Sequence, residues 1–105
     1  METLTRQLAI EYGGRGIRCL CLRPNGMPEA ARTDSHSNTV FSDAARRQGL
    51  DLEEMLESFP EGTTLKRSPT LREVADAAVF FASPSASSFT GTVEKIGPGD
   101  TTLTL

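Results

Sequence analysis

The strongest constraint on the fold is a short apolar run at residues 17–23, bounded by glycines before it and by Pro24-Asn25-Gly26 after it. Apolar side chains fall in both of its alternating sets, which is typical of a strand covered on both faces. Strands of this kind occur in parallel sheets, where the connection needs a crossover of a dozen or more residues. The run therefore predicts an α/β fold built on a parallel sheet.

The segments around this run complete a βαβ unit. Residues 2–12 form an apolar stripe that predicts a helix, and residues 70–82 predict a second helix followed by a strand at 92–96. The expected stripes consist of Met1, Leu4, Leu8 and Tyr12 in the first helix, and of Leu71, Val74, Ala75, Ala78, Val79 and Ala82 in the second. A parallel pair with a right-handed crossover follows, in a single partial Rossmann-like domain over residues 1–105.

Residues 27–66 form a long excursion between the first strand and the second helix. The segment carries Pro, Ser, Thr, Asn and Asp, and two short helices are expected near residues 42–48 and 52–59. A connection of this length inside a compact domain is typically functional or mobile.

Composition and charge exclude several classes of protein. The net charge is −3 with no basic stripe, which argues against nucleic-acid binding. No apolar run approaches the roughly 20 residues of a membrane span, and residues 1–10 alternate polar and apolar side chains, so we expect a cytoplasmic protein. Cys19 and Cys21 stand two apart in the strand, which predicts buried reduced thiols rather than a disulfide or a metal site.

Three stretches of the chain resemble the short-chain dehydrogenase/reductase family. They read LTRQLAIEYG followed by GIR at residues 4–18, LRPNGM at residues 22–27, and RSP through EVA, FFAS and SFTGTV at residues 67–93. The first is similar to the helix that follows the family's catalytic Tyr-x-x-x-Lys, the second to its Pro-Gly segment, and the third to its last crossover helix and final strand.

The resemblance implies the C-terminal part of a doubly wound Rossmann-type sheet in an NAD- or NADP-dependent oxidoreductase. Such an enzyme transfers hydride between the nicotinamide and a small alcohol or carbonyl substrate. Ligands of these sheets lie beyond the carboxyl ends of the strands, so the expected cofactor-binding residues are Pro24, Asn25, Gly26 and Met27. Residues 27–66 then correspond to a substrate lid that closes over the reacting centre.

The sequence also departs from the family in its functional residues. The glycines at 13–16 follow a helix instead of a strand, which is the wrong order for a pyrophosphate cradle. Tyr12 has Gly16 rather than lysine four residues later, so we expect it to pack, and no catalytic or metal residue is assigned. The family's Tyr and Lys are expected upstream of Met1. Glu29 replaces a cofactor-contacting Thr, and Gly97-Pro98-Gly99 replaces Asp-Gly-Gly.

Other polar clusters are expected to be solvated. A Ser/His/Asp cluster at residues 34–38 suggests hydrolase chemistry, but triads are assembled from distant segments, and a polar loop is expected there. The acidic residues between 51 and 57 are expected to form the wet face of a short helix. The pairs Arg46-Arg47 and Lys66-Arg67 are expected to be surface charge.

Three functional hypotheses follow. The first is an oxidoreductase of the family. This chain alone is expected to be inactive and to bind no NAD or NADP by itself. The second is a non-catalytic interaction module that forms a homo-oligomer or docks onto a full-length relative through its helix and strand surfaces. The third is a remnant without selected activity.

Overall fold

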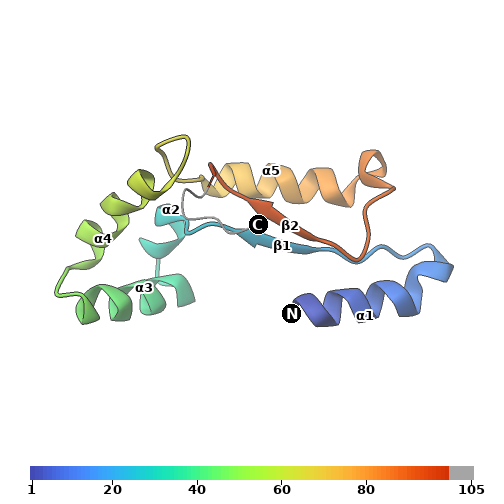
Figure 1. The fold of residues 1–105 in the computed structure, drawn as a ribbon, viewed down its shortest axis with the longest axis horizontal. Helices are drawn as coiled ribbons and strands as arrows, with labels where there is room; N and C mark the ends of the chain where they lie inside the picture. The colour runs from blue at the N-terminus through green and yellow to red at the C-terminus, as the bar shows by residue number, and fades with distance from the viewer. Residues whose placement is uncertain (100–105) are drawn as a thin grey trace. The chain divides into compact units, whose positions relative to one another are not determined.

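The computed structural model describes residues 1–99 and divides the chain into two compact units (Figure 1). The first unit comprises residues 1–24 and 72–96. The second comprises residues 25–71 together with the segment that begins at Gly97. Within residues 1–99, no helix combines the length and the apolar character that a membrane crossing requires.

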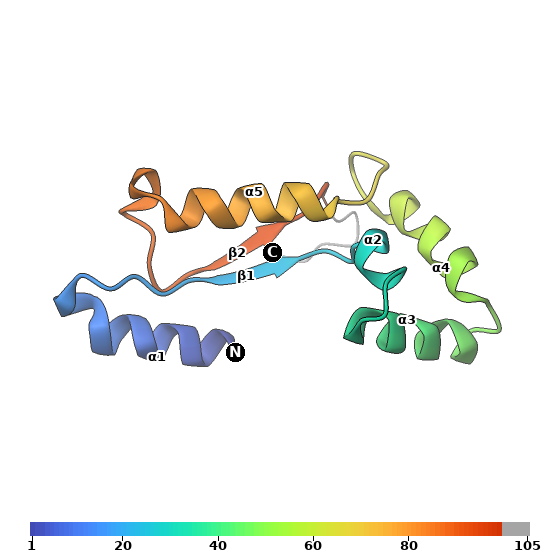
Figure 2. The same ribbon diagram turned by 180° about the vertical axis from the view of Figure 1, so that it is seen from behind.

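The first unit is the predicted βαβ arrangement. Its elements are α1 (Glu2–Tyr12), η1 (Gly13–Arg15), β1 (Cys21–Pro24), α5 (Leu71–Ala82), η3 (Pro84–Ala86) and β2 (Val93–Ile96). Strands β1 and β2 pair in parallel, with Cys21 opposite Val93 and Pro24 opposite Ile96. The α/β class and the parallel pairing are therefore confirmed, as Figure 2 shows from behind.

The first strand is shorter than its apolar run. Regular pairing begins at Cys21, although residue 19 already bonds to the segment before β2: the Gly91 N–H donates to the Cys19 carbonyl at 2.7 Å, and the Cys19 N–H donates to the Thr90 hydroxyl at 3.1 Å. Both cysteines are free and half-buried, so the expected full burial of these thiols was wrong.

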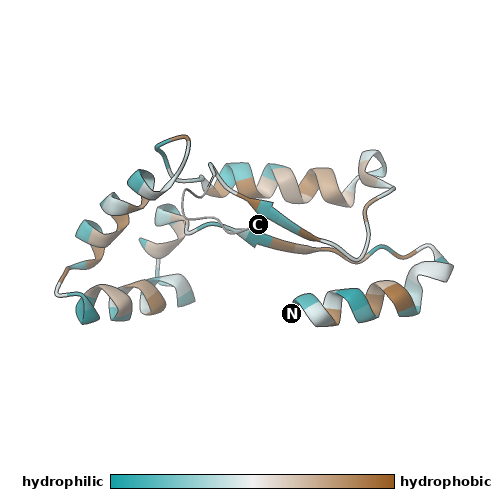
Figure 3. Cartoon of the chain, in the orientation of Figure 1, coloured by the Kyte–Doolittle hydropathy of each residue, from teal (hydrophilic) through white to brown (hydrophobic). Residues whose placement is uncertain are grey.

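The expected buried stripe of α5 was wrong in part. Val74 and Ala78 are half-buried, whereas Leu71 is 42% and Val79 69% exposed, and Ala75 and Ala82 are also exposed. The helix is apolar around much of its circumference (Figure 3). Two strands can cover only one side of such a helix, so the rest of its apolar surface stays exposed.

The first helix shows the same effect. It buries Thr5 and Ala9 and leaves Met1 and Leu4 exposed, while Leu8 and Tyr12 are half-buried. A methyl group added at Gly91 would lie 3.4 Å from the Ala9 side chain, which places this face of α1 against the segment that leads into β2.

The second unit is largely helical. It contains α2 (Pro28–Ala31), α3 (His36–Arg47), α4 (Leu52–Ser58) and η2 (Phe59–Gly62). The helix expected at 52–59 is confirmed, and it begins with a capping box in which the Asp51 carboxylate accepts the Glu54 N–H at 2.8 Å. Leu56 of this helix is the one large side chain that is fully buried among the described residues.

The start of α3 differs from the prediction. The helix begins at His36 rather than near residue 42, because Ser35 caps it. The Ser35 hydroxyl accepts the Asn38 N–H at 3.2 Å and donates to the Ala30 carbonyl at 2.7 Å. The polar loop expected at 34–38 was therefore wrong, since these residues build a helix terminus.

Candidate functional site

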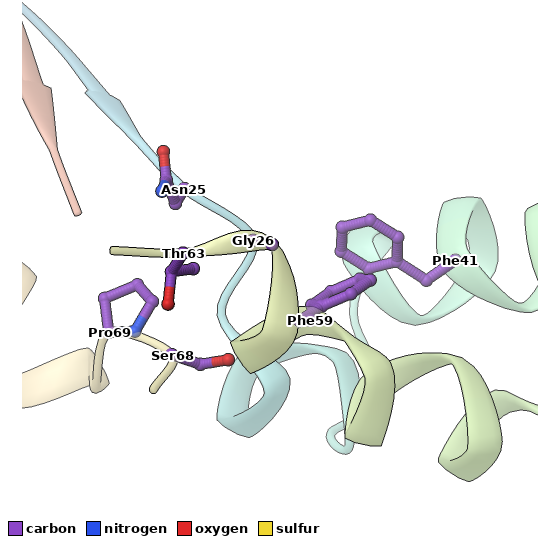
Figure 4. Close-up of a pocket in the computed structure, with 8 residues that line it drawn as sticks. Asn25, Gly26, Phe41, Phe59, Thr63, Ser68 and Pro69 are labelled. Atoms are coloured by element: carbon purple, nitrogen blue, oxygen red, sulfur yellow. The ribbon is translucent and has the colours of Figure 1, made fainter. Parts of the chain in front are cut away.

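A cavity of about 290 Å³ lies in the second unit, next to the segment expected to contact the cofactor (Figure 4). Its lining comprises Asn25, Gly26, Phe41, Phe59, Gly62, Thr63, Ser68 and Pro69. Of the four residues predicted from sequence, Asn25 and Gly26 line this cavity. Pro24 is the last residue of β1, and Met27 is the N-cap of α2.

Two aromatic rings form the apolar wall of the cavity. Phe41 of α3 and Phe59 of η2 meet edge to face, with ring centroids 5.2 Å apart and planes inclined by 68°. Gly26 lets the Phe59 ring lie close to the backbone, because a methyl group at position 26 would be only 2.9 Å from Cε2 of Phe59. Edge-to-face pairs of this kind are favoured by the ring quadrupoles, so the wall is a defined aromatic surface.

Thr63 is buried, but its hydroxyl is already engaged by the chain. The oxygen lies 2.8 Å from the Pro60 carbonyl and 3.0 Å from the Arg67 carbonyl, and it accepts the Arg67 N–H at 3.1 Å. These contacts close a turn in which Lys66 adopts a left-handed φ of 57°. The Thr63 hydroxyl therefore holds the cavity wall and has little capacity left for a ligand.

Ser68 differs from Thr63 in this respect. Its hydroxyl is buried and has no hydrogen-bond partner within residues 1–99. Figure 4 shows the oxygen directed toward Phe59. A buried hydroxyl without a partner costs about 1–3 kcal/mol, and because this oxygen is covered it offers no accessible contact in the cavity.

The cavity lining carries no charged side chain. The nearby Lys66 ammonium donates to the Glu61 carbonyl at 3.1 Å instead. Within residues 1–99, no three His, Cys, Asp or Glu side chains gather where they could hold a metal ion. The site is thus a neutral cavity with an aromatic wall, whose polar lining residues are Asn25, Thr63 and Ser68.

Asn25 explains one departure from the family pattern. Its side chain occupies the space beside Gly97, where a methyl group would lie 2.5 Å from Cγ and Nδ2 of the asparagine. Position 97 is where the family usually has the aspartate of Asp-Gly-Gly. The asparagine side chain at position 25 therefore fits because position 97 carries no side chain.

The glycines at 13–16 do not form a phosphate cradle. The Gly13 N–H donates to the Ala9 carbonyl, the Gly16 N–H to the Gly13 carbonyl at 3.0 Å, and the Ile17 N–H to the Tyr12 carbonyl at 3.3 Å. These amides terminate α1. Arg15 lies over the Tyr12 ring, with its Cζ 5.9 Å from the centroid, which agrees with a packing role for this tyrosine.

Glu29 also has a structural role. Its carboxylate accepts the Leu71 N–H at 3.3 Å, at the first residue of α5, where a negative charge is favoured by the helix dipole. A carboxylate at this position does not suit contact with a phosphate-bearing cofactor. The Glu29 carboxylate and the amides at 13–16 are thus engaged within the chain.

The acidic residues between 51 and 57 are exposed, as expected of a wet face, and several of them have defined partners. Asp51 and Glu54 make the capping box of α4, and Glu53 forms a bidentate ion pair with Arg32 at 2.9 and 3.1 Å. The hydrogen bond from Arg32 lowers the pKa of Glu53, and the same bond raises the pKa of Arg32. These groups hold α2 and α4 together and do not line the cavity.

Comparison with known proteins identifies the family. A family model described as "Enoyl-(Acyl carrier protein) reductase" matches residues 1–99. The galactitol 2-dehydrogenase (L-tagatose-forming) of Cereibacter sphaeroides is 33% identical over 101 residues, which cover 96% of this chain and 34% of that protein. The inactive 2-(S)-hydroxypropyl-CoM dehydrogenase 2 of Xanthobacter autotrophicus is 34% identical, over 96% of this chain and 40% of that protein.

Solved structures give the same fold. The sorbitol-6-phosphate 2-dehydrogenase of Erwinia amylovora superposes with a TM-score of 0.75 at 23% identity, covering 93% of this chain and 37% of that one. The L-sorbose reductase of Gluconobacter frateurii, complexed with NADPH and L-sorbose, superposes with a TM-score of 0.70 at 22% identity, covering 98% and 38%. The chain spans 34% and 40% of the lengths of the two curated relatives above. By sequence and by its Rossmann-type α/β fold, the chain belongs to the short-chain dehydrogenase/reductase family.

Proposed function

We propose that this chain forms the substrate side of an NAD(P)-dependent oxidoreductase that transfers hydride between a nicotinamide and an alcohol or carbonyl substrate. The observation that carries the proposal is the cavity in which Asn25 and Gly26, directly after β1, meet the aromatic wall of the 27–66 segment. Ligands of open parallel sheets bind beyond the carboxyl ends of the strands. The dehydrogenase and reductase relatives support this reaction type, and the NADPH named with the L-sorbose reductase supports the cofactor class.

The 105 residues are proposed to need further groups for catalysis. Proton transfer to or from the substrate oxygen requires a correctly placed acid or base, and Tyr12 has no lysine four residues later. We therefore expect the chain to show neither turnover nor micromolar affinity for NADH or NADPH in a fluorescence titration. Micromolar binding of either dinucleotide would contradict this part of the proposal.

A chimera tests the positive part of the proposal. This chain would replace the matching segment of the galactitol 2-dehydrogenase of Cereibacter sphaeroides, which supplies the rest of the enzyme. We expect dinucleotide binding to persist and alcohol oxidation to occur with a changed substrate preference. In a second chimera, Phe41→Ala should remove part of the aromatic wall and lower kcat/KM while dinucleotide binding stays. A folded chimera that binds the dinucleotide but oxidises no alcohol would reject the proposed function.

A second candidate function is the interaction module, with a homo-oligomer or a full-length relative as its partner. It is supported by apolar side chains that the first unit leaves exposed, including Ile10 at 77% and Val79 at 69%. Contiguous exposed apolar surface is typical of interaction sites. Sedimentation over a range of concentrations tests it: Val79→Asp should reduce association, and a wild-type chain that stays monomeric at high concentration would reject it.

A further inference from the structure

The two edges of the sheet in the first unit differ in their side chains. Strand β2 carries Glu94 and Lys95 next to each other, and charges of this kind protect an exposed edge from pairing with another chain. The run at residues 19–22, which leads into and begins β1, carries only cysteine and leucine, and all four side chains are half-buried. The β1 edge therefore lacks the protection that the β2 edge has.

The pairing with β2 leaves every second residue of this run with its backbone groups directed outward. The Cys21 N–H donates to the Thr92 carbonyl at 3.0 Å, so Cys21 directs its backbone groups toward β2. Backbone groups alternate in direction along a strand, so those of Leu20 and Leu22 point to the free edge. Among the described residues, only the Cys21 thiol approaches one of them, at 3.9 Å from the Leu22 carbonyl. Such a row of N–H and C=O groups is a template for a further strand.

The cations on either side of this run are engaged by their own chain. Arg23 forms an ion pair with Glu2 at 2.9 Å. The Arg18 guanidinium donates to the carbonyls of Phe89 and Ser83, both at 3.3 Å. These contacts lie within the first unit, and they lower the like-charge repulsion that two copies of the edge would otherwise meet.

Apolar surface continues beside β1. A hollow of about 450 Å³ there has an apolar lining that includes Leu20, Leu22, Ala78 and Phe81. A strand added at the β1 edge with leucines on the same face would place them beside this hollow. Removal of apolar surface from water favours such an association.

We propose that two copies of the chain associate by antiparallel pairing of their β1 edges, which joins the two sheets into one of four strands. The edge is complementary to itself, because a two-fold axis places the donors and acceptors of Leu20 opposite those of Leu22 in the second copy. Both such pairs are hydrogen-bonded pairs. Arg23 then lies opposite Cys19 of the second copy, so the register sets no two like charges directly against each other.

This register brings one pair of thiols together. Cys21 lies opposite Cys21 of the second copy in a non-hydrogen-bonded pair, in which the Cα atoms are about 4.5 Å apart. This separation falls within the range of about 4.4–6.8 Å that a disulfide spans. Cys19 has no such partner, because it lies opposite Arg23. The Cys21 thiol therefore reports on the register, whereas the Cys19 thiol does not.

Cross-linking of single-cysteine variants tests the register. Cys19→Ser and Cys21→Ser each leave one thiol, and diamide joins two thiols in a disulfide as it takes up their two hydrogen atoms. We expect Cys19→Ser to give a disulfide-linked dimer whose yield rises with protein concentration, and Cys21→Ser to give far less. Equal cross-linking of the two variants, or no cross-linking of Cys19→Ser, would overturn the inference.

A proline variant tests the edge without oxidation. Leu20→Pro removes an N–H that points to the free edge, a position at which an edge strand tolerates proline. Each dimer then lacks two hydrogen bonds, so self-association in sedimentation under reducing conditions should weaken about tenfold. Val93→Pro is the matched control: Val93 lies opposite Cys21, so its N–H points to the other edge, and self-association should not change. Circular dichroism checks that both variants fold. Undiminished self-association of folded Leu20→Pro would contradict edge pairing.

The inference rests on the interaction-module candidate, since it names the partner and the surface of that module, and it does not depend on hydride transfer. Self-association that persists in Leu20→Pro without a Cys21 disulfide would reject edge pairing and leave the module standing. A wild-type chain that stays monomeric at high concentration would reject both. Neither result bears on the oxidoreductase proposal, which is decided by alcohol oxidation in the chimera.

Discussion

Gly97 has no room for a side chain, because the Asn25 side chain fills the space beside it. We expect Gly97→Ala to lower the free energy of unfolding by about 1–3 kcal/mol, the usual effect of inserting atoms into a packed site. The urea midpoint measures this effect. Gly62→Ala is the control, since a methyl group there meets nothing within 4 Å.

The pairing of these two positions can be tested directly. Asn25→Ala combined with Gly97→Ala should recover most of the stability lost by the glycine variant alone, because the truncated side chain makes space for the new methyl group. Additive losses in the double variant would show that the two positions are not coupled.

The ion pair between Arg32 and Glu53 makes a pH-dependent contribution to stability. The hydrogen bond from Arg32 lowers the pKa of Glu53 in the folded chain. The stabilisation is therefore present above the ordinary glutamate pKa of about 4.3 and is lost as the pH falls through the lower folded value. We expect Glu53→Gln to flatten the fall of the urea midpoint below this pH. Glu11→Gln, on α1, should leave the slope unchanged.

Individual residues could be predicted from sequence only where a family motif marks them. Asn25 and Gly26 were predicted to bind the cofactor for this reason; the structure places them in the lining of the cavity, and the cofactor contact stays a prediction. Phe41 and Phe59 were not, because they carry no motif and come together only when the 27–66 segment folds. The sequence signal that was available is the presence of two phenylalanines in an otherwise polar segment.

Among the elements, α3 depends on its cap. We expect Ser35→Ala to destabilise the chain by about 0.5–2 kcal/mol, because an N-cap side chain satisfies an amide that the helix leaves free. This variant also loses the bond to the Ala30 carbonyl. Helical circular dichroism during a urea titration measures the effect, and Ser37→Ala, two residues later in the same helix turn, serves as control. Equal stability of both variants would contradict a capping role.

Elements with a clear apolar period were predicted well, and those set by caps were not. The bounds of α1, α5 and β2 agree with the sequence pattern to within about two residues, the usual precision of helix limits. The start of α3 was missed because Ser35 and Asn38 carry hydrogen-bonding information without an apolar period. The exposed face of α5 was missed because a helix pattern does not reveal how many strands cover it.

The whole molecule is expected to unfold with low cooperativity. Two strands leave the sheet with unpaired edges, and isolated two-stranded pairs are marginally stable. Tyr12 is the only tyrosine, so its fluorescence reports on the first unit, while circular dichroism reports on helices of both units. We expect the two signals to give broad, non-coincident urea transitions. One sharp transition seen by both probes would contradict this expectation.

The α/β class could be predicted for the whole chain because the order of its elements leaves few alternatives. The expected parallel pairing of β1 with β2 is observed. The division into two units could not be predicted, because it depends on which contacts form around the 27–66 segment.

Strand pairing gives the two cysteines a use as reporters. The backbone of Cys19 accepts a hydrogen bond from Gly91, and that of Cys21 donates one to Thr92 at 3.0 Å, while both thiols are free and partly covered. When β1 separates from β2, the sulfur atoms become open to alkylation. The rate at which iodoacetamide modifies them thus measures how often the sheet opens, without any introduced label.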